Sequence, residues 1–181
     1  APGWSDNPPM VSARVLFVTP QDAEWLVSAD TRTGRPYAVD PRVVEGDADY
    51  RYLVPGSHGE VFLLGQRPAT GRPGGRVRSR AAAVVGRVVR FDPRHPGTPG
   101  VPLDLPDAIT GRGRAVGGVL YCPTRKGLYV ADYTDPRTPV LRGPLIAWED
   151  PARVACEAVV LQSTVLIARG DGTLEAYPVK R

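Results

Sequence analysis

The sequence is poor in the residues that build metal centres and disulfide frameworks. Its 181 residues include two histidines, His58 and His95, and two cysteines, Cys122 and Cys156, and neither pair is closely spaced. Protein metal sites usually draw on ligands that come in close pairs, so we expect no metal. Both cysteines lie among apolar neighbours, which favours reduced, buried thiols in an intracellular protein over a disulfide.

Long hydrophobic runs are missing as well. The longest apolar stretch, VACEAVVLQSTVLIA, is interrupted by Glu157 and Gln162, and a membrane-spanning helix needs about 20 apolar residues. The opening APGWSDNPP has neither the basic start nor the apolar core of a signal peptide. We therefore expect no membrane association and an intracellular location, cytoplasmic, or nuclear if the source is a eukaryotic virus. Residues 1–9 are expected to form a flexible tail ahead of Met10.

The motifs of common cofactor sites are also absent. Neither lysine follows the Gly-x-x-x-x-Gly spacer of a phosphate-binding P-loop. In GRGRAVGG, Val116 stands where the dinucleotide fingerprint requires its third glycine. In PGSHGE, Pro55 stands where a nucleophile elbow requires its first glycine. We expect no cofactor.

Glycine and proline, by contrast, are abundant. The chain contains 20 of each, well above the average for globular proteins. This composition favours many turns and short strands over long helices. We expect one β-rich domain over residues 10–181, all-β or α+β. Its mostly antiparallel sheet would be barrel- or sandwich-like, with one or two short helices packed on it.

Three β-hairpins are predicted from apolar runs that flank turn residues. YRYLV and EVFLLGQ enclose the loop 55–59, and GVLYC and GLYVADY enclose residues 123–126. TVLIA and TLEAYPV enclose Asp171-Gly172, a pair suited to a tight hairpin turn. Further strands are expected at SARVLFVT, AAAVVGRVVRF and TPVLRGPLIAW.

Two short helices are predicted where a capping residue precedes proline. Thr19-Pro20 opens TPQDAEWLVSA, residues 19–29, and Asp150-Pro151 opens DPARVACEAVVLQ, residues 150–162. Proline is favoured in the first turn of a helix, directly after the cap. A single helical turn is also possible at PDAIT.

A short motif recurs along the chain. A strand followed by Asp-Pro-Arg occurs in YAVDPR, VRFDPR and YTDPR, and GLYVADYTDPRTPVLRGPL resembles a strand–turn–strand unit of a β-propeller blade. The aspartates at positions 40, 92 and 135 follow no single period. A propeller needs at least four blades of about forty residues, and the chain is short for that. A repeat architecture is therefore the alternative, and a single sheet is preferred.

The basic charge is concentrated in the middle of the chain. The formal net charge is +4, and residues 61–114 hold ten basic and three acidic residues, a local net charge of +7. Of the 23 basic residues, 21 are arginine, a bias typical of high-GC genomes. The arginine content is therefore not informative by itself, but its clustering is.

The arginines gather in two glycine-containing segments that are each expected to form a loop. GQRPATGRPGGRVRSR, residues 65–80, carries five arginines and no acid, and TGRGRAVGG carries two more. Guanidinium groups bind phosphate through paired hydrogen bonds, and small residues let a nucleic-acid backbone approach. No aromatic residue lies between Phe62 and Phe91, so base stacking is not expected. The candidate anion-binding residues are Arg67, Arg72, Arg76, Arg78, Arg80, Arg112 and Arg114; a solvated loop without a binding role is the competing interpretation.

We thus predict a binding or interaction module that is not an enzyme. Its anionic partner would be nucleic acid or, second, an acidic protein surface. The alternative is a small hydrolase or transferase centred on the loop that carries Ser57, His58 and Glu60, with His58 as a general base. A deep pocket that holds His58 beside a buried carboxylate would favour the enzyme, and a flat or saddle-shaped basic face would favour binding.

Overall fold

The chain is built from antiparallel β-sheets. The computed structural model describes residues 9–18, 26–37, 48–69, 84–93, 95, 100–148, 155–161 and 163–178. Within these residues every regular element is a strand, and the strands form four separate antiparallel sheets. The predicted β-rich, antiparallel class is confirmed.

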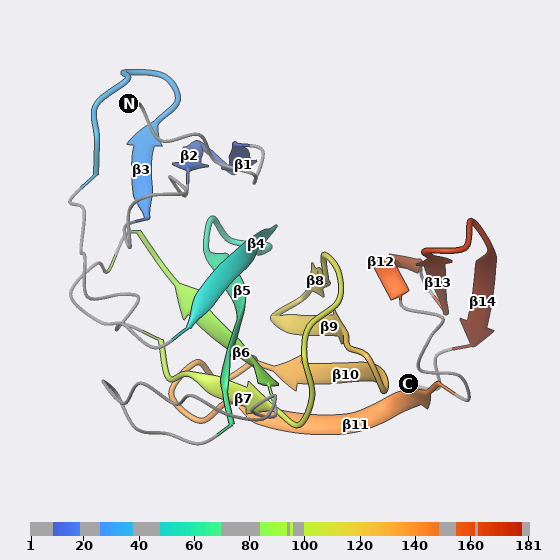
Figure 1. Cartoon of the computed structure of the whole chain (residues 1–181). Coiled ribbons are helices and arrows are strands. Elements are labelled where there is room, and N and C mark those ends of the chain that lie inside the picture. Colours follow the sequence, from blue (N-terminus) through green and yellow to red (C-terminus); the bar gives the residue numbers. More distant parts are fainter. Residues whose placement is uncertain are drawn as a thin grey trace, which may run out of the picture.

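Each sheet consists of strands that are consecutive in the sequence and pair with their neighbours in order (Figure 1). Sheet 1 contains β1 (Met10–Ser12), β2 (Val15–Val18) and β3 (Val27–Asp30). Sheet 2 contains β4 (Asp49–Pro55), β5 (Val61–Pro68), β6 (Val84–Phe91) and β7 (Leu103–Leu105). Sheet 3 contains β8 (Arg114–Val116), β9 (Val119–Pro123), β10 (Gly127–Asp132) and β11 (Val140–Ala147). Sheet 4 contains β12 (Ala155–Leu161), β13 (Thr164–Arg169) and β14 (Leu174–Pro178).

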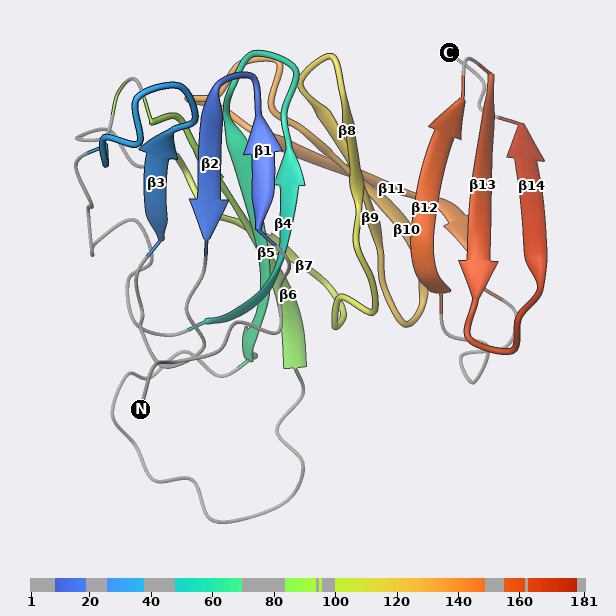
Figure 2. The ribbon, with the colours of Figure 1, turned by 90° about the horizontal axis from the view of Figure 1, so that it is seen from above.

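The four sheets form a row in sequence order, with sheet 1 at one end and sheet 4 at the other (Figure 2). The first strand of each sheet contacts the first strand of the next, β1 with β4, β4 with β8 and β8 with β12. β1, β4 and β12 point the same way in Figure 2. Arg112, just before β8, forms a parallel bridge with Glu157 of β12. The first strands thus line one side of the row in parallel.

Three apolar layers fill the spaces between neighbouring sheets. The layer between sheets 1 and 2 includes Phe17 and Leu63, the layer between sheets 2 and 3 includes Leu64 and Leu120, and the layer between sheets 3 and 4 is built around Trp148. β5 contributes to two of them, because its side chains alternate between its two faces. Val61 and Leu63 face sheet 1, whereas Phe62 and Leu64 face sheet 3. A strand buried on both faces explains the unbroken apolar run VFLL.

The helix predicted for residues 150–162 is wrong over residues 155–161, which form β12. Along β12, Ala158 is buried whereas Val159 and Leu161 are exposed, a period of two. β-branched residues such as Val159 and Val160 favour this extended conformation. A short apolar run does not by itself distinguish a buried helix from a strand, so pairing with β13 decides the outcome.

The helix predicted for residues 19–29 is wrong at its end, because Val27–Asp30 forms β3; residues 19–25 lie outside the described part. Leu26, within the sequence predicted to be helical, is buried. The single strand expected at SARVLFVT is instead a hairpin that turns at Ala13, which has a φ of 52°. The possible helical turn at PDAIT is not formed, because Ile109 pairs with Thr124 in a β-bridge.

The three predicted hairpins are confirmed as β4–β5, β9–β10 and β13–β14. In the last of these, Gly172 has a φ of +84°, a conformation that glycine adopts without steric cost. No closed barrel is found in the described residues. Within the same residues, no helix is long and apolar enough to cross a membrane.

Burial of β5 on both faces gives a direct mutational test. Leu63→Ala and Leu64→Ala should each lower the free energy of unfolding by about 2–5 kcal/mol, because each removes a side chain from a different packed layer. Val140→Ala, at a position on β11 that is 51% exposed, is the control and should change it by less than about 0.5 kcal/mol. Urea unfolding measures all three. A small effect of either β5 substitution would mean that one face of this strand is solvent-exposed.

Candidate anion-binding site

The structure describes only part of the arginine-rich segment 65–80. The loop expected at residues 65–80 is wrong at its start, because residues 65–68 belong to β5, and Arg67 lies opposite Val85 of β6. Arg72, Arg76, Arg78 and Arg80 lie outside the described residues, so their part in the site stays a prediction.

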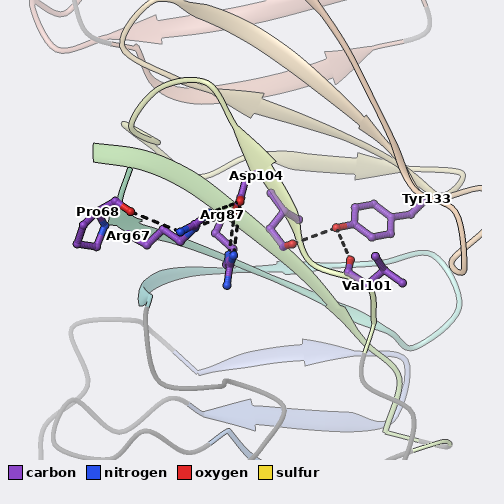
Figure 3. Close-up of polar contacts among 7 residues, drawn as sticks. Arg67, Pro68, Arg87, Val101, Asp104 and Tyr133 are labelled. Carbon is purple, nitrogen blue, oxygen red and sulfur yellow. Dashed lines mark hydrogen bonds and ion pairs between the residues drawn. The ribbon is translucent and has the colours of Figure 1, made fainter. Parts of the chain in front are cut away.

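Arg67 is held in an ion-pair cluster with Arg87 and Asp104, which come from three neighbouring strands of sheet 2 (Figure 3). Arg67 Nε lies 3.2 Å and Arg87 Nε 2.9 Å from Asp104 Oδ1, and Arg67 Nη2 donates to Asp104 Oδ2. Arg67 Nη1 also donates to the Pro68 carbonyl at 3.5 Å. Arg67 therefore fixes the end of β5, and its guanidinium is occupied by protein acceptors.

The cluster changes the acidity of Asp104. The hydrogen bond from Arg67 is the largest influence, and with Arg87 it outweighs partial burial and lowers the pKa of Asp104 from 3.8 to about 2. Asp104 is thus ionised throughout the physiological pH range, and its negative charge neutralises one of the two positive charges of Arg67 and Arg87.

Tyr133 ties this part of sheet 2 to sheet 3 (Figure 3). Its single O–H donates to the Val88 carbonyl at 3.0 Å, and the Val101 carbonyl oxygen, 3.4 Å away, is a second, weaker acceptor for the same proton. Its ring packs edge-on against Phe62, with centroids 5.3 Å apart. Burial raises the pKa of Tyr133, so the hydroxyl stays protonated and remains a donor. The positions of β6 and β7, which carry Arg87 and Asp104, therefore depend on an interaction that no motif in the sequence predicts.

The second basic segment, expected as a glycine loop, begins the first strand of sheet 3. A Cβ on Gly113 would lie 2.5 Å from the Tyr121 carbonyl oxygen and 3.3 Å from Leu64 Cδ2. Glycine is needed here for close packing rather than for mobility. Gly117 and Gly118, with φ of 57° and 82°, form the turn into β9.

Arg112 and Arg114 differ from the neighbouring arginines. Arg112 is half-buried and Arg114 is exposed, and within the described ranges neither side chain has an acidic partner. Several other arginines do have one: Arg125 lies 3.5 Å from Asp107, Arg142 lies 2.8 Å from Asp132, and Arg169 pairs with Glu175.

The two basic segments approach each other at the end of β5. Gln66 Nε2 donates to the Ile109 carbonyl at 2.7 Å, and Gly86 N donates to the Asp107 carbonyl at 2.9 Å. These bonds hold the β5 and β6 ends, between which residues 69–83 run, against the residues that lead to Arg112. The start of the first basic segment, at Gln66, is thus tied to residues that directly precede the second segment.

The Ser57–Glu60 loop uses its polar groups for its own structure. Glu60 is buried, and its Oε2 accepts a hydrogen bond from the backbone N–H of His58 at 2.9 Å. Ser57 Oγ accepts one from Gly117 N at 3.2 Å. Glu60 thus binds the backbone of His58 and holds the loop, which is not the arrangement of a base and its orienting carboxylate.

Two further residues considered from the sequence, His95 and Cys122, lie in a turn and in the protein interior. His95 is exposed and its Nδ1 lies 3.3 Å from Asp92 Oδ2, in the turn after β6. Cys122 is a free, buried thiol, and burial raises its pKa. Among the described residues, no three His, Cys, Asp or Glu side chains are grouped to hold a metal ion.

Comparisons with known proteins inform the fold. No protein-family model matches the chain, and no curated protein matches it. Among solved structures, the chain is similar to the computationally designed Ika4 protein, with a TM-score of 0.59, 12% identity, and coverage of 98% of this chain and 92% of that chain. It is also similar to BamB from Moraxella catarrhalis, with a TM-score of 0.54, 14% identity, and coverage of 97% of this chain and 45% of that chain.

The likeness shows the fold alone. BamB is a β-propeller, and the four sheets described here follow one another as propeller blades do. The chain spans a little under half the length of that BamB chain. The blade-like arrangement, which the sequence offered only as the alternative to a single sheet, is the one the chain adopts.

Asp104→Asn tests the ion-pair cluster. The substitution should lower the free energy of unfolding at pH 7 by about 1 kcal/mol, a modest cost because the Asp104 side chain is 39% exposed and solvent screens the pair. Because folding lowers the pKa of Asp104, its ionised form stabilises the fold above pH about 4, and this contribution disappears as the pH falls towards 2. The difference between wild type and variant in urea unfolding should therefore narrow over that range. A difference that widens in acid would contradict the assignment.

Gly113→Ala tests whether the second basic segment is a packed strand. The new methyl group would collide with the Tyr121 carbonyl, so we expect a loss of about 1–3 kcal/mol in the free energy of unfolding. Thermal and urea unfolding measure this loss. If the segment were a mobile loop, the same substitution would be neutral or slightly stabilising, because alanine restricts the unfolded chain.

Proposed function

We propose that the protein is a non-enzymatic binding module whose arginines hold an anionic partner, and that this partner is nucleic acid in an intracellular compartment. The observation that carries the proposal is the state of Arg112 and Arg114. Within the described ranges they lack an acidic partner, whereas Arg67 and Arg87 share Asp104.

The charge distribution supports an anionic partner. Residues 61–114 have a local net charge of +7, and the hydrogen bond from Gln66 to Ile109 ties the start of the first basic segment to residues that precede the second. A concentrated positive field attracts polyanions and steers their association. Arg67 belongs to the support of the site rather than to the binding set, because Asp104 and the Pro68 carbonyl occupy its donors.

The residue types favour a nucleic-acid backbone over an acidic protein surface. Arg112 and Arg114 alternate along β8 and its approach, and Arg76, Arg78 and Arg80 alternate in the same way. Glycines lie beside several of them, which leaves room for a phosphate chain. Because no aromatic residue lies between Phe62 and Phe91, recognition would be electrostatic and tolerant of sequence.

The hydrolase or transferase alternative gains no support from the geometry. The carboxylate of Glu60 accepts the His58 backbone N–H. The Ser57 hydroxyl accepts the Gly117 N–H. Both groups that would serve His58 in catalysis are engaged in holding the loop.

Arginine substitutions test the proposal. The double variant Arg112→Ala, Arg114→Ala and the triple variant Arg76→Ala, Arg78→Ala, Arg80→Ala should each bind a short single-stranded oligonucleotide more weakly. The expected loss is roughly fivefold per removed phosphate contact, or about 1 kcal/mol. The dependence of affinity on salt should also become shallower by about one unit of slope per contact. Fluorescence anisotropy across a salt series from about 50 mM upward measures both quantities.

Arg142→Ala is the matched control, because Arg142 is exposed and paired with Asp132. It should leave the affinity unchanged. Equal affinities for wild type, double and triple variants, or no binding at low salt, would contradict the proposal. Tighter binding to a polyanionic peptide than to the oligonucleotide would assign the surface to an acidic protein instead.

A further inference from the structure

The two end sheets of the row each have one face that points away from the other three sheets (Figure 2). The inner faces of sheets 1 and 4 pack into the apolar layers, through Phe17 in sheet 1 and through Val165 and Ile167 in sheet 4. Side chains alternate along a strand, so the register of each sheet identifies the residues on its outer face.

The outer face of sheet 4 is mainly apolar. Val159 lies opposite Leu166, which lies opposite Ala176. The neighbouring row continues with Ala168 and Leu174 and ends at the exposed Glu157, at the β12 edge of the face. Leu161 extends the face along β12. Val159, Leu161 and Leu174 are 42%, 51% and 67% exposed, so the face is open to solvent in a single copy.

The outer face of sheet 1 is apolar as well. Val11 lies opposite Leu16, which lies opposite Ala29, and Val18 lies opposite Val27. Val11 is 56% exposed. All five outward side chains are aliphatic, although a sheet with one solvent-facing side normally presents polar residues on that side.

These outer faces are apolar, as are the layers inside the row. The internal layers join apolar sheet faces, and Leu63 of sheet 2 and Phe17 of sheet 1 belong to one such layer. An exposed apolar surface of this kind marks an interaction site. Another sheet with an apolar face would fit such a surface. The chain itself has one such face at each end of the row, on sheet 1 and on sheet 4.

The length of the row fits closure by a second copy. Four sheets cover 45% of the BamB chain, so two copies supply nearly the length of that propeller. Eight sheets lie within the usual range of propeller blades. A contact between different faces of two identical chains closes when a two-fold axis repeats it.

We propose that two copies of this chain associate head to tail, with sheet 1 of each copy packed on sheet 4 of the other, and close a ring of eight sheets. In this ring β12 of one copy lies beside β1 of its partner, in the relation that β8 and β12 have within the chain. The association buries Val11 and Leu16 of one copy against Val159 and Leu174 of the other.

The mass of the chain in solution tests the proposal. Light scattering coupled to size-exclusion chromatography should give twice the 19.4 kDa mass of the chain. Val11→Asp and Val159→Asp, one on each outer face, should each shift the protein to the single-chain mass. Val140→Asp is the matched control, because Val140 is 51% exposed on β11 of sheet 3, away from both outer faces. It should leave the doubled mass unchanged, and circular dichroism checks that all three variants keep their β structure.

Mixing the two disrupting variants separates a head-to-tail contact from any other. In a dimer of one Val11→Asp chain and one Val159→Asp chain, one of the two contacts contains no aspartate. The mixture should therefore recover the doubled mass at concentrations at which neither variant does so alone. A wild-type chain that keeps the single-chain mass at all concentrations overturns the proposal. The proposal is also overturned if both single variants keep the doubled mass, or if the mixture of variants stays at the single-chain mass. A mass that keeps growing with concentration overturns it as well.

Discussion

The structure depends on packing one small sheet on the next. A unit of three or four short strands, about 40 residues, buries too little apolar surface to be stable alone. Here each neighbouring pair of sheets shares an apolar layer, and β5 serves two layers through alternating side chains. In the layer between sheets 3 and 4, Trp148 packs with Leu128 and Ile167 while its indole N–H donates to the Thr124 carbonyl at 2.7 Å. The indole of Trp148 is thus buried with its N–H hydrogen-bonded.

This dependence divides the arginines into two groups. Arg169 is buried over the Trp148 ring, 4.1 Å from its centroid, and pairs with Glu175. Together with Arg67 and Arg87 it belongs to the architecture. Arg112 and Arg114 flank Gly113 at the start of the first strand of sheet 3, where a Cβ on Gly113 would meet Tyr121 and Leu64. Within the described residues neither guanidinium has an acidic partner, and the proposed binding surface rests on this difference from Arg67 and Arg87.

The β-rich class and the hairpins could be predicted from the sequence, because apolar runs and turn residues act locally. The order of packing could not. The Asp-Pro-Arg repeats at 92 and 135 both follow the third strand of a sheet, β6 and β10. The long segment between β5 and β6 lies between the Asp-Pro-Arg motifs at 40 and 92. It makes their spacing larger than that between the motifs at 92 and 135, so the sequence shows no constant period. β12 was misread as a helix because its apolar run fits both periods, and only pairing with β13 distinguishes them.

The candidate site shows the same limit. Clustering of arginine in residues 65–80 and around Arg112 was visible in the sequence, since charge is a local property. The capture of Arg67 by Asp104 and the anchoring of sheet 2 by Tyr133 were not, because they join residues 37 and 45 positions apart. Likewise, the role of Glu60 in holding its loop depends on burial that its neighbours in sequence do not indicate.

Amide hydrogen exchange tests most directly whether sheet-on-sheet packing stabilises the fold. Backbone amides are protected in proportion to the free energy of opening the structure around them. Sheets 2 and 3 are packed on both faces, so the slowest amides of dilute protein should lie in β5, β6, β9 and β10. Those of β1–β3 and β12–β14 should exchange faster. Slowest exchange in sheet 1 or sheet 4 would contradict this account.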